Sequence, residues 1–452
     1  MIFFPSTPRT SSTLCSTSEH EFSTLRPDPD SDTLESISDQ ERTGLNSSDF
    51  EHRESGSRES EATPASPVPK PSAGGEASIH PTDVHWMQHA LDLAQKGRYG
   101  ASPNPMVGAA LIDADGCLVG EGYHERCGGP HAEVNALVQA GNSAHGGTIY
   151  VTLEPCAHQG RTPPCVDSII AAGIRRVVVA VNDPNPVASG GLDILRTEGI
   201  EVTEGIRSES GRILNRRWMR WAHTRRPWVS AKAATSLDGR IATRTGHSKW
   251  ITGTAARDRG LELREEHDAI CVGIGTVLAD NPRLTRRLGL NPGDDWHRVI
   301  LDSTLRTPSG ASVVESSPET TIIAHTAEAT ESDRLRLETT GVELVELAGD
   351  DHGRIDIGAL LDHLGSRGMT ALLVEGGAAV HGSFFDADLV DEVFFFVAPL
   401  IIGGDAPSAV GGLGVADLEM AHRFHHEDVR HHGDDLELHC VRPEDADVHG
   451  SD

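Results

Sequence analysis

Short apolar runs that alternate with segments of helical spacing are the feature that most restricts how this chain can fold. The runs Thr148–Leu153 and Arg176–Val181 predict buried strands, whereas His85–Gln95 has its apolar residues at helical spacing. Alternating strands and helices are typical of layered α/β domains. A second series predicts further strands near Ala269–Ile274, Arg298–Asp302, Thr321–Ala324, Ala371–Glu375 and Glu392–Val397. The sequence therefore predicts two α/β domains.

Composition places the boundaries of these domains. Residues 1–80 are rich in Ser, Thr, Glu, Asp and Pro, and we expect a disordered acidic tail because so few apolar side chains cannot offset the entropy of ordering. The first domain is predicted at 81–207 and the second at 227–443, with a linker helix at 208–226 between them and a short tail at 444–452.

The linker segment is basic and leaves two interpretations open. Six arginines and two tryptophans in residues 208–226 are compatible with a nucleic-acid face, but they also suit a helix between domains. The whole chain has 39 Lys and Arg against 68 Asp and Glu, a formal charge of −29, which repels phosphate backbones and anionic membranes. We favour the linker helix and expect no nucleic-acid partner.

Location is predicted from what the chain does not contain. No apolar run approaches the roughly 20 residues of a membrane span, and the N-terminus lacks the basic and apolar regions of a secretory signal. The seven cysteines are too sparse for a disulfide scaffold. We expect a cytoplasmic protein with reduced thiols and no membrane partner.

A metal-binding pattern lies in the first domain. His131 and Glu133 precede Cys156 and Cys165, and an imidazole with two thiolates supplies three ligands for Zn²⁺ while leaving the fourth position for water. Zinc lowers the pKa of such a water toward neutrality. Glu133 need not bind the metal and can carry protons between the water, a ring nitrogen and departing ammonia.

Other residues near this pattern keep alternative roles. His124 and Cys127 lie close to His131 and are rival ligands, although neither fits the order of the pattern. Asn104 follows Pro103 and precedes Pro105, so its amide either contacts a pyrimidine edge or belongs to a turn.

The order His-x-Glu, Pro-Cys, Cys is the signature of zinc-dependent nucleobase deaminases. Eight residues separate Cys156 from Cys165 instead of the usual two, and this spacing resembles the deaminase domain of the RibD family of riboflavin-biosynthesis enzymes. The runs 102–108 and 128–133 also resemble motifs of that family. The resemblance implies a cytidine-deaminase-like α/β/α fold.

The second domain carries no decisive motif of its own. It has neither a P-loop nor a complete Gly-x-Gly-x-x-Gly sequence, since Leu278 stands at the third glycine position, and its chemistry stays open on physical grounds alone. Residues 232–242, 248–252, 276–287 and 374–377, however, are similar to the reductase domain of the RibD family. The resemblance implies a dihydrofolate-reductase-like α/β fold that uses NADPH.

Site residues of the second domain follow from the same resemblance. The NADPH site would be lined by Ala234, Trp250, Thr276, Asp280, Ser303, Gly377, Ala378, Ala379, Val380, His381, Gly382 and Ser383. The substrate site would be lined by Ser248, Arg264, Leu284, Arg287 and Glu375. Arginine forks match phosphate oxygens, which suits a ribose phosphate.

The resemblance thus implies a bifunctional enzyme of riboflavin biosynthesis with a small phosphorylated pyrimidine as substrate, and we expect it to self-associate into a homo-oligomer. The zinc-dependent domain would deaminate 2,5-diamino-6-ribosylamino-4(3H)-pyrimidinone 5′-phosphate, and the NADPH-dependent domain would reduce the ribosyl chain of the product. Two alternatives are a nucleic-acid base deaminase with a C-terminal binding module and a non-catalytic zinc- and nucleotide-binding protein. The first requires a basic groove with aromatic platforms, and the second a closed four-ligand metal site.

Overall fold

The computed structural model describes residues 80–159, 163–291, 293 and 296–443, and the tails predicted at 1–80 and 444–452 fall outside these residues except for residue 80. Helices and strands alternate through the first domain as predicted. Its elements are α1 (Pro81–Ala94), η1 (Gln95–Gly97), β1 (Gly108–Ile112), β2 (Leu118–Tyr123), α2 (Ala132–Ala140), η2 (Gly141–Ala144), β3 (Thr148–Val151), α3 (Cys165–Ala171), β4 (Arg176–Val179), α4 (Gly191–Thr197) and β5 (Glu201–Thr203), followed by the predicted linker helix α5 (Ser208–Thr224).

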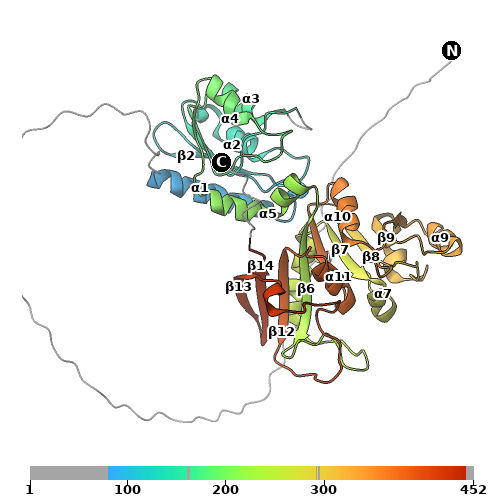
Figure 1. The fold of residues 1–452 in the computed structure, drawn as a ribbon. Coiled ribbons are helices and arrows are strands. Elements are labelled where there is room, and N and C mark those ends of the chain that lie inside the picture. The colour runs from blue at the N-terminus through green and yellow to red at the C-terminus, as the bar shows by residue number, and fades with distance from the viewer. Residues whose placement is uncertain (1–79, 160–162, 292, 294–295, 444–452) are drawn as a thin grey trace, which may run out of the picture. The chain divides into compact units, whose positions relative to one another are not determined.

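The first domain has three layers. Its sheet has the order β2-β1-β3-β4-β5, with β3, β4 and β5 parallel and β1 antiparallel to both of its neighbours. Alternate strand residues point to opposite faces. Ala109 and Ile149 pack with α2, α3 and α4, whereas Ala110 and Tyr150 pack with α1 and α5 (Figure 1). Both faces of the sheet are therefore buried.

Strand β2 is longer than the sequence suggests. It runs from Leu118 to Tyr123 through Gly120 and Gly122, although glycine inside a strand disfavours an extended run. The structure needs both glycines because α2 lies against them, and a Cβ at Gly122 would lie 2.1 Å from the carbonyl oxygen of Ala132. Close packing of helix on strand thus explains residues that local propensity assigns to a turn.

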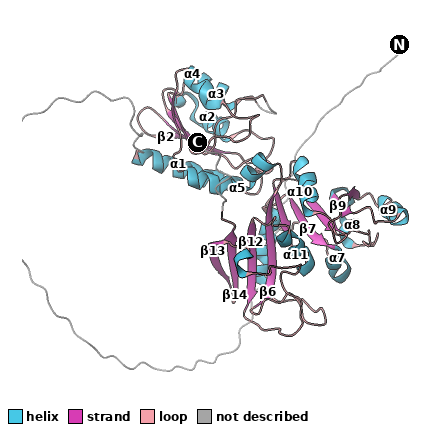
Figure 2. Cartoon of the chain, viewed as in Figure 1, coloured by secondary structure: helices cyan, strands magenta, loops and turns pink. Residues whose placement is uncertain are grey.

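The second domain is built around a nine-stranded sheet. Figure 2 shows its strands in magenta between helices in cyan. Its elements are β6 (Trp228–Ser236), α6 (Thr254–Glu265), β7 (Ala269–Gly273), α7 (Ile274–Asp280), β8 (His297–Leu301), α8 (Ser312–Ser316), η3 (Pro318–Thr320), β9 (Thr321–His325), α9 (Glu331–Glu338), β10 (Glu343–Glu346), α10 (Ile357–Ser366), β11 (Ala371–Val374), α11 (Ala378–Asp386), β12 (Glu392–Ala398), η4 (Leu418–Met420), β13 (His425–His432) and β14 (Asp435–Val441).

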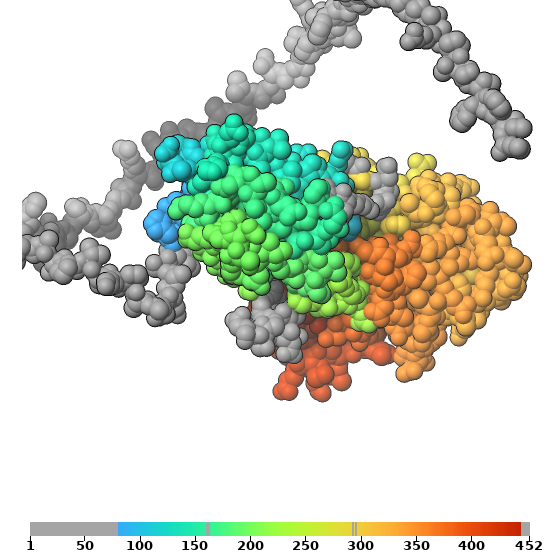
Figure 3. All heavy atoms as spheres, turned by 90° about the horizontal axis from the view of Figure 1, so that it is seen from above, coloured from blue at the N-terminus to red at the C-terminus, as the bar shows by residue number. Residues whose placement is uncertain are grey.

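Strand order in this sheet decides which loops meet. The order is β10-β9-β8-β7-β11-β6-β12-β14-β13, parallel from β10 to β12, with β14 and β13 added antiparallel. Helices α10 and α11 pack on one face, and α6 to α9 supply buried residues to the other. The side chains of 297–366, coloured yellow to orange, form a continuous packed surface in Figure 3. Parallel strands bring their carboxyl ends to one edge, where ligands of α/β sheets commonly bind.

Within the described part of the chain, we find no helix with the length and apolar character needed to cross a bilayer.

Gly108 tests the packing of α1 on the first sheet. A Cβ at this position would lie 2.0 Å from the carbonyl oxygen of Ala90 and 2.7 Å from the amide nitrogen of Ala94. We expect Gly108→Ala to lower the free energy of unfolding by about 1–3 kcal/mol, because helix and strand must separate. Calorimetric unfolding of the full chain measures this. In the control Gly310→Ala the nearest atom, a Glu315 carboxylate oxygen, is 3.6 Å away, and an equal effect of both changes would contradict the packing argument.

Candidate active sites

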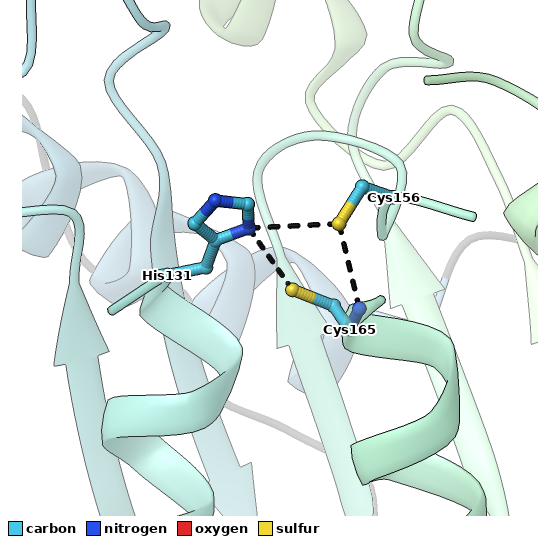
Figure 4. Close-up of side chains that lie close together, drawn as sticks. All are labelled: His131, Cys156 and Cys165. Carbon is cyan, nitrogen blue, oxygen red and sulfur yellow. Dashed lines mark hydrogen bonds between the residues drawn. The ribbon is translucent and has the colours of Figure 1, made fainter. Parts of the chain in front are cut away.

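Two helix starts and one loop bring the three predicted zinc ligands together. His131 is the residue before α2, Cys165 is the first residue of α3, and Cys156 lies on the chain that follows β3. Figure 4 shows the imidazole and both sulfurs pointing toward one another. The three ligand atoms lie within 4.8 Å of one another, and no other such group of His, Cys, Asp or Glu occurs in the described residues.

The distances fit tetrahedral zinc. Metal–nitrogen and metal–sulfur bonds of about 2.05 and 2.3 Å at a tetrahedral angle place nitrogen and sulfur about 3.6 Å apart. The Nδ1 atom of His131 is 3.6 Å from the Cys156 sulfur and 3.1 Å from the Cys165 sulfur. The residues present can therefore hold Zn²⁺ with only small movements.

The electrostatics of the site favour a thiolate. A hydrogen bond from the Cys165 thiol, with help from His131, lowers the pKa of Cys156 to about 4. The same hydrogen bond and burial raise the pKa of Cys165, while the hydrogen bond with Cys156 raises that of His131. One sulfur is thus ionised before metal binding, and metal ligation ionises the other.

Glu133 lies beside these ligands in a cavity of about 420 Å³. Its carboxyl group is buried, with 3% of the residue exposed, and burial raises its pKa. His131, Glu133 and Cys156 line the cavity together with Asn104 and Asn185. Burial that raises the pKa of a carboxyl group makes its protonated form easier to reach, which suits a group that takes up and releases a proton.

Hydrogen bonds constrain the rival ligand His124. Its Nδ1 lies 3.1 Å from the carbonyl oxygen of Pro130, and its Nε2 lies 3.0 Å from the side-chain nitrogen of Asn104. Burial lowers the pKa of His124, so the ring is neutral, donates from Nδ1 and accepts at Nε2. Both ring nitrogens are occupied, and His124 instead positions the Asn104 amide in the cavity lining. Cys127 also lines the cavity but does not belong to the ligand group.

Sequence reasoning missed an acidic residue in this cavity. Asp183 is 9% exposed, and burial, reinforced by the charges of Glu154 and Cys156, raises its pKa to about 6. Glu154 fixes the surrounding loop by accepting from the backbone amides of Asp183, Gly190 and Leu192. The available signal was the Asp-Pro-Asn-Pro run that begins two residues after the predicted strand Arg176–Val181, since the carboxyl end of a parallel strand commonly faces a ligand.

The second domain contains a cavity of about 720 Å³ at the carboxyl edge of its parallel strands. Ten of the twelve residues predicted for NADPH line it: Ala234, Thr276, Asp280, Ser303, Gly377, Ala378, Ala379, Val380, His381 and Ser383. Helix α11 begins there, directly after Gly377, and no heavy atom lies within 4 Å of a Cβ built on Gly377. An open cradle at the N-terminal end of a helix, where the backbone dipoles favour negative charge, suits a cofactor phosphate.

Two residues predicted for NADPH lie elsewhere. Trp250 is 69% exposed, and the Arg257 guanidinium carbon stands 4.6 Å from the centre of its ring. Gly382 is buried in α11 against the backbone of Gly411 and Gly412. Neither lines the cavity of this structure.

The predicted substrate residues also divide. Ser248 and Glu375 line the cavity, whereas Arg264, Leu284 and Arg287 do not. Leu284 is 4% exposed and packs in the core, and Arg287 is exposed with a 3.4 Å hydrogen bond to Thr285.

Arg264 holds Glu375 instead of lining the cavity. Its Nε and Nη2 donate to the two carboxylate oxygens at 2.8 Å each. Burial raises the pKa of Glu375, but the positive charges of Arg264 and Lys232 outweigh it and the pKa falls to about 2. Lys232 lines the cavity as well. The cavity therefore contains a permanently ionised carboxylate beside a lysine.

Comparisons with known proteins match each domain separately and the chain as a whole. The cytidine and deoxycytidylate deaminase zinc-binding region matches residues 81–181, and the RibD C-terminal domain matches residues 227–437. The riboflavin biosynthesis protein RibD of Bacillus amyloliquefaciens is 41% identical over 366 residues, which cover 80% of this chain and 97% of that protein. The chain belongs to the RibD family.

Further members of the RibD family agree. RibD of Escherichia coli is 40% identical over 371 residues, which cover 79% of this chain and 99% of that protein. A solved structure of Acinetobacter baumannii RibD is 37% identical with a TM-score of 0.72, covering 80% of this chain and 99% of that one. The predicted family and the predicted fold class, a cytidine-deaminase-like domain followed by a RibD reductase domain, are confirmed.

Loss of one sulfur tests the metal site of this RibD-family chain. We expect Cys156→Ala to weaken zinc binding by more than about 100-fold, because even indirect partners of metal ligands contribute 10- to 100-fold. Zinc content after dialysis against a competing chelator, measured by atomic emission, reports the loss. The control Cys117→Ala removes an exposed thiol and should keep its zinc. Equal zinc content in both variants would show that Cys156 is no ligand.

Proposed function

We propose that the two cavities carry out successive steps of riboflavin biosynthesis, with zinc in the first and NADPH in the second. The chain is a deaminase and reductase of this pathway. A solved relative from Thermotoga maritima, 34% identical with a TM-score of 0.68 and covering 80% of this chain, is described as a diaminohydroxyphosphoribosylaminopyrimidine deaminase/5-amino-6-(5-phosphoribosylamino)uracil reductase. The observation that carries the proposal is the convergence of His131, Cys156 and Cys165 beside buried Glu133.

In the first cavity the proposed substrate is 2,5-diamino-6-ribosylamino-4(3H)-pyrimidinone 5′-phosphate. Zinc held by His131, Cys156 and Cys165 would make a water molecule nucleophilic near neutral pH. Glu133 would take one proton from such a water and pass it to a ring nitrogen as the water oxygen bonds to the amine-bearing carbon. Glu133 would then move the second proton to the amine, so that the carbon–nitrogen bond breaks and ammonia leaves. Asn104, held by His124, orients the ring.

In the second cavity the deaminated product would have its ribosyl chain reduced to ribityl. NADPH, when bound, supplies the hydride, and the chain supplies binding and orientation. The first turn of α11 holds a cofactor phosphate, while Ser248, Lys232 and Glu375 face the reacting end of the cavity. Arg264 keeps Glu375 ionised and fixed.

Neither alternative suits the described residues. Trp218 of α5 is only 7% exposed, and Arg216 and Arg217 donate to Glu392, so these three residues are engaged within the protein instead of forming a free aromatic and basic face. The zinc ligand group has three members among the described residues, which leaves a position for substrate water, unlike a closed structural site. We retain as proposals the domain limits 81–207 and 227–443, a cytoplasmic location, and homo-oligomerisation.

Glu133→Gln separates metal binding from catalysis. The amide keeps the size of the side chain but cannot carry protons, so ammonia release should fall by about 10²- to 10⁴-fold while zinc content is unchanged. Ammonia is measured with the diaminopyrimidine ribotide as substrate. Glu198→Gln, on the exposed surface of the same domain, is the control. Retained deamination in Glu133→Gln would refute the proposed role of Glu133.

The same variant tests the order of the two reactions. With the diaminopyrimidine ribotide, Glu133→Gln should oxidise almost no NADPH, because the reductase substrate is not formed. With the deaminated ribotide it should oxidise NADPH at the unaltered rate, which absorbance at the NADPH band follows. Mass spectrometry identifies the products. Rapid NADPH oxidation with the diamino compound would mean that reduction does not require prior deamination.

A further inference from the structure

The reductase cavity has one end that the predicted site residues leave largely unexplained. Lys232 and Glu375 belong to β6 and the end of β11, whereas Arg306 follows β8 and Arg354 follows β10. Strands β8 and β10 lie on the opposite side of β11 from β6. The cavity therefore runs along the carboxyl edge of the sheet, from a reacting end near Lys232 to a basic end near Arg354.

Arg354 is held in place by its own loop. The carboxylate of Asp350 accepts from the backbone amides of His352 and Arg354 and, at 2.8 Å, from the Nε of the Arg354 side chain. The residue that follows, Ile355, is 4% exposed and packs in the core with α10. The loop is thus closed by hydrogen bonds at its base and anchored by an apolar side chain.

This anchoring leaves the outer edge of the guanidinium group for a ligand. The Asp350 carboxylate engages Nε, and no hydrogen bond from Nη1 or Nη2 of Arg354 is recorded among the described residues. Two terminal nitrogens in one plane match the oxygens of a phosphate group. The Asp350 carboxylate accepts from the loop amides and from Nε of Arg354. It therefore fixes the direction of the guanidinium group and leaves Nη1 and Nη2 available to a ligand.

We propose that Arg354 binds the 2′-phosphate of NADPH and sets the preference of the reductase for NADPH over NADH. The inference rests on the proposed function of this cavity. With the cofactor diphosphate at the first turn of α11 and the nicotinamide toward Lys232, the adenosine half extends toward the loops after β8 and β10. A phosphate on that half is the only chemical difference between the two cofactors, and Arg354 lines the cavity there. Asp350 is a positioning residue.

The phosphate of the pyrimidine substrate is the other anion that Arg354 could meet. Its reacting carbon must lie beside the nicotinamide, so the substrate occupies the end of the cavity at Ser248 and Glu375. Arg354 belongs to the opposite end by strand order. The two phosphates are distinguished by which ligand loses affinity when the arginine is replaced.

Binding of NADP⁺ and NAD⁺ to the full-length chain tests the proposal by calorimetry. We expect Arg354→Gln to raise the Kd for NADP⁺ by roughly 10- to 100-fold and to leave the Kd for NAD⁺ within about twofold, because only the charge-assisted bonds to one phosphate are lost. The control Arg367→Gln removes an arginine of the same domain that pairs with Glu343 and should change neither affinity.

Asp350→Asn serves as a second variant. It keeps the guanidinium charge but weakens the group that aims it, so the Kd for NADP⁺ should rise by a smaller factor than in Arg354→Gln, with NAD⁺ unchanged. An unchanged Kd for NADP⁺ in Arg354→Gln, a parallel loss of NAD⁺, or a selective rise in the KM of the pyrimidine would overturn the proposal. Wild-type protein that bound both dinucleotides equally would also refute it while sparing the reductase assignment, whereas binding of neither would defeat both.

Discussion

The deaminase half depends on bringing two thiols and an imidazole together in a nearly buried site. Each residue is placed by backbone geometry: His131 ends the approach to α2, Cys165 begins α3, and Cys156 leaves the carboxyl end of β3. Buried thiolates require a compensating cation. A single cation bound by all three residues would link the segments that carry them, so each segment would depend on the others for its position. The glycines of β2 serve the same end, because they let α2 approach the sheet closely enough to place His131.

The reductase half uses the same edge of a parallel sheet in another way. Here the backbone itself forms the binding surface, since α11 opens directly onto the cavity and a side chain at Gly377 would occupy it. Lys232 and Glu375 lie at one end of the cavity and Arg306 and Arg354 at the other, and Asp280 of α7 also lines it. A cavity with charged residues placed in this way recognises an extended, multiply charged ligand by the positions of the ligand's charges as well as by its shape.

How much of each site the sequence could predict depends on how local its chemistry is. The zinc site could be predicted because it shows in the type and order of a few residues and in the turns beside them. The alternation of strands and helices could be predicted for the same reason, since it too is a local pattern. The pairing of Arg264 with Glu375 could not be predicted from the sequence, because 111 positions separate the two residues and either side chain could have faced solvent or substrate. Leu284 and Trp250 show the same limit: one is buried in the core, the other is 69% exposed, and tertiary packing decides between them. Arg354 lacked any motif, and only strand order places it at the cavity.

Two buried glutamates in this chain show how surroundings assign opposite roles to one residue type. Glu133 lies beside two sulfurs and an imidazole. Burial raises the pKa of its carboxyl group, and no arginine or lysine contributes to lowering it. Glu375 is also largely enclosed, with 11% of its side chain exposed, yet Arg264 and Lys232 lower its pKa to about 2. Proton transfer requires a group that is stable in both protonation states, whereas orienting a cationic or hydrogen-bonding partner requires one that never loses its charge. Of these two residues, Glu133 meets the first condition beside the proposed zinc site, and Glu375 meets the second in the proposed cofactor cavity. The neighbours of the two carboxyl groups thus agree with the proposed division of chemistry between the domains.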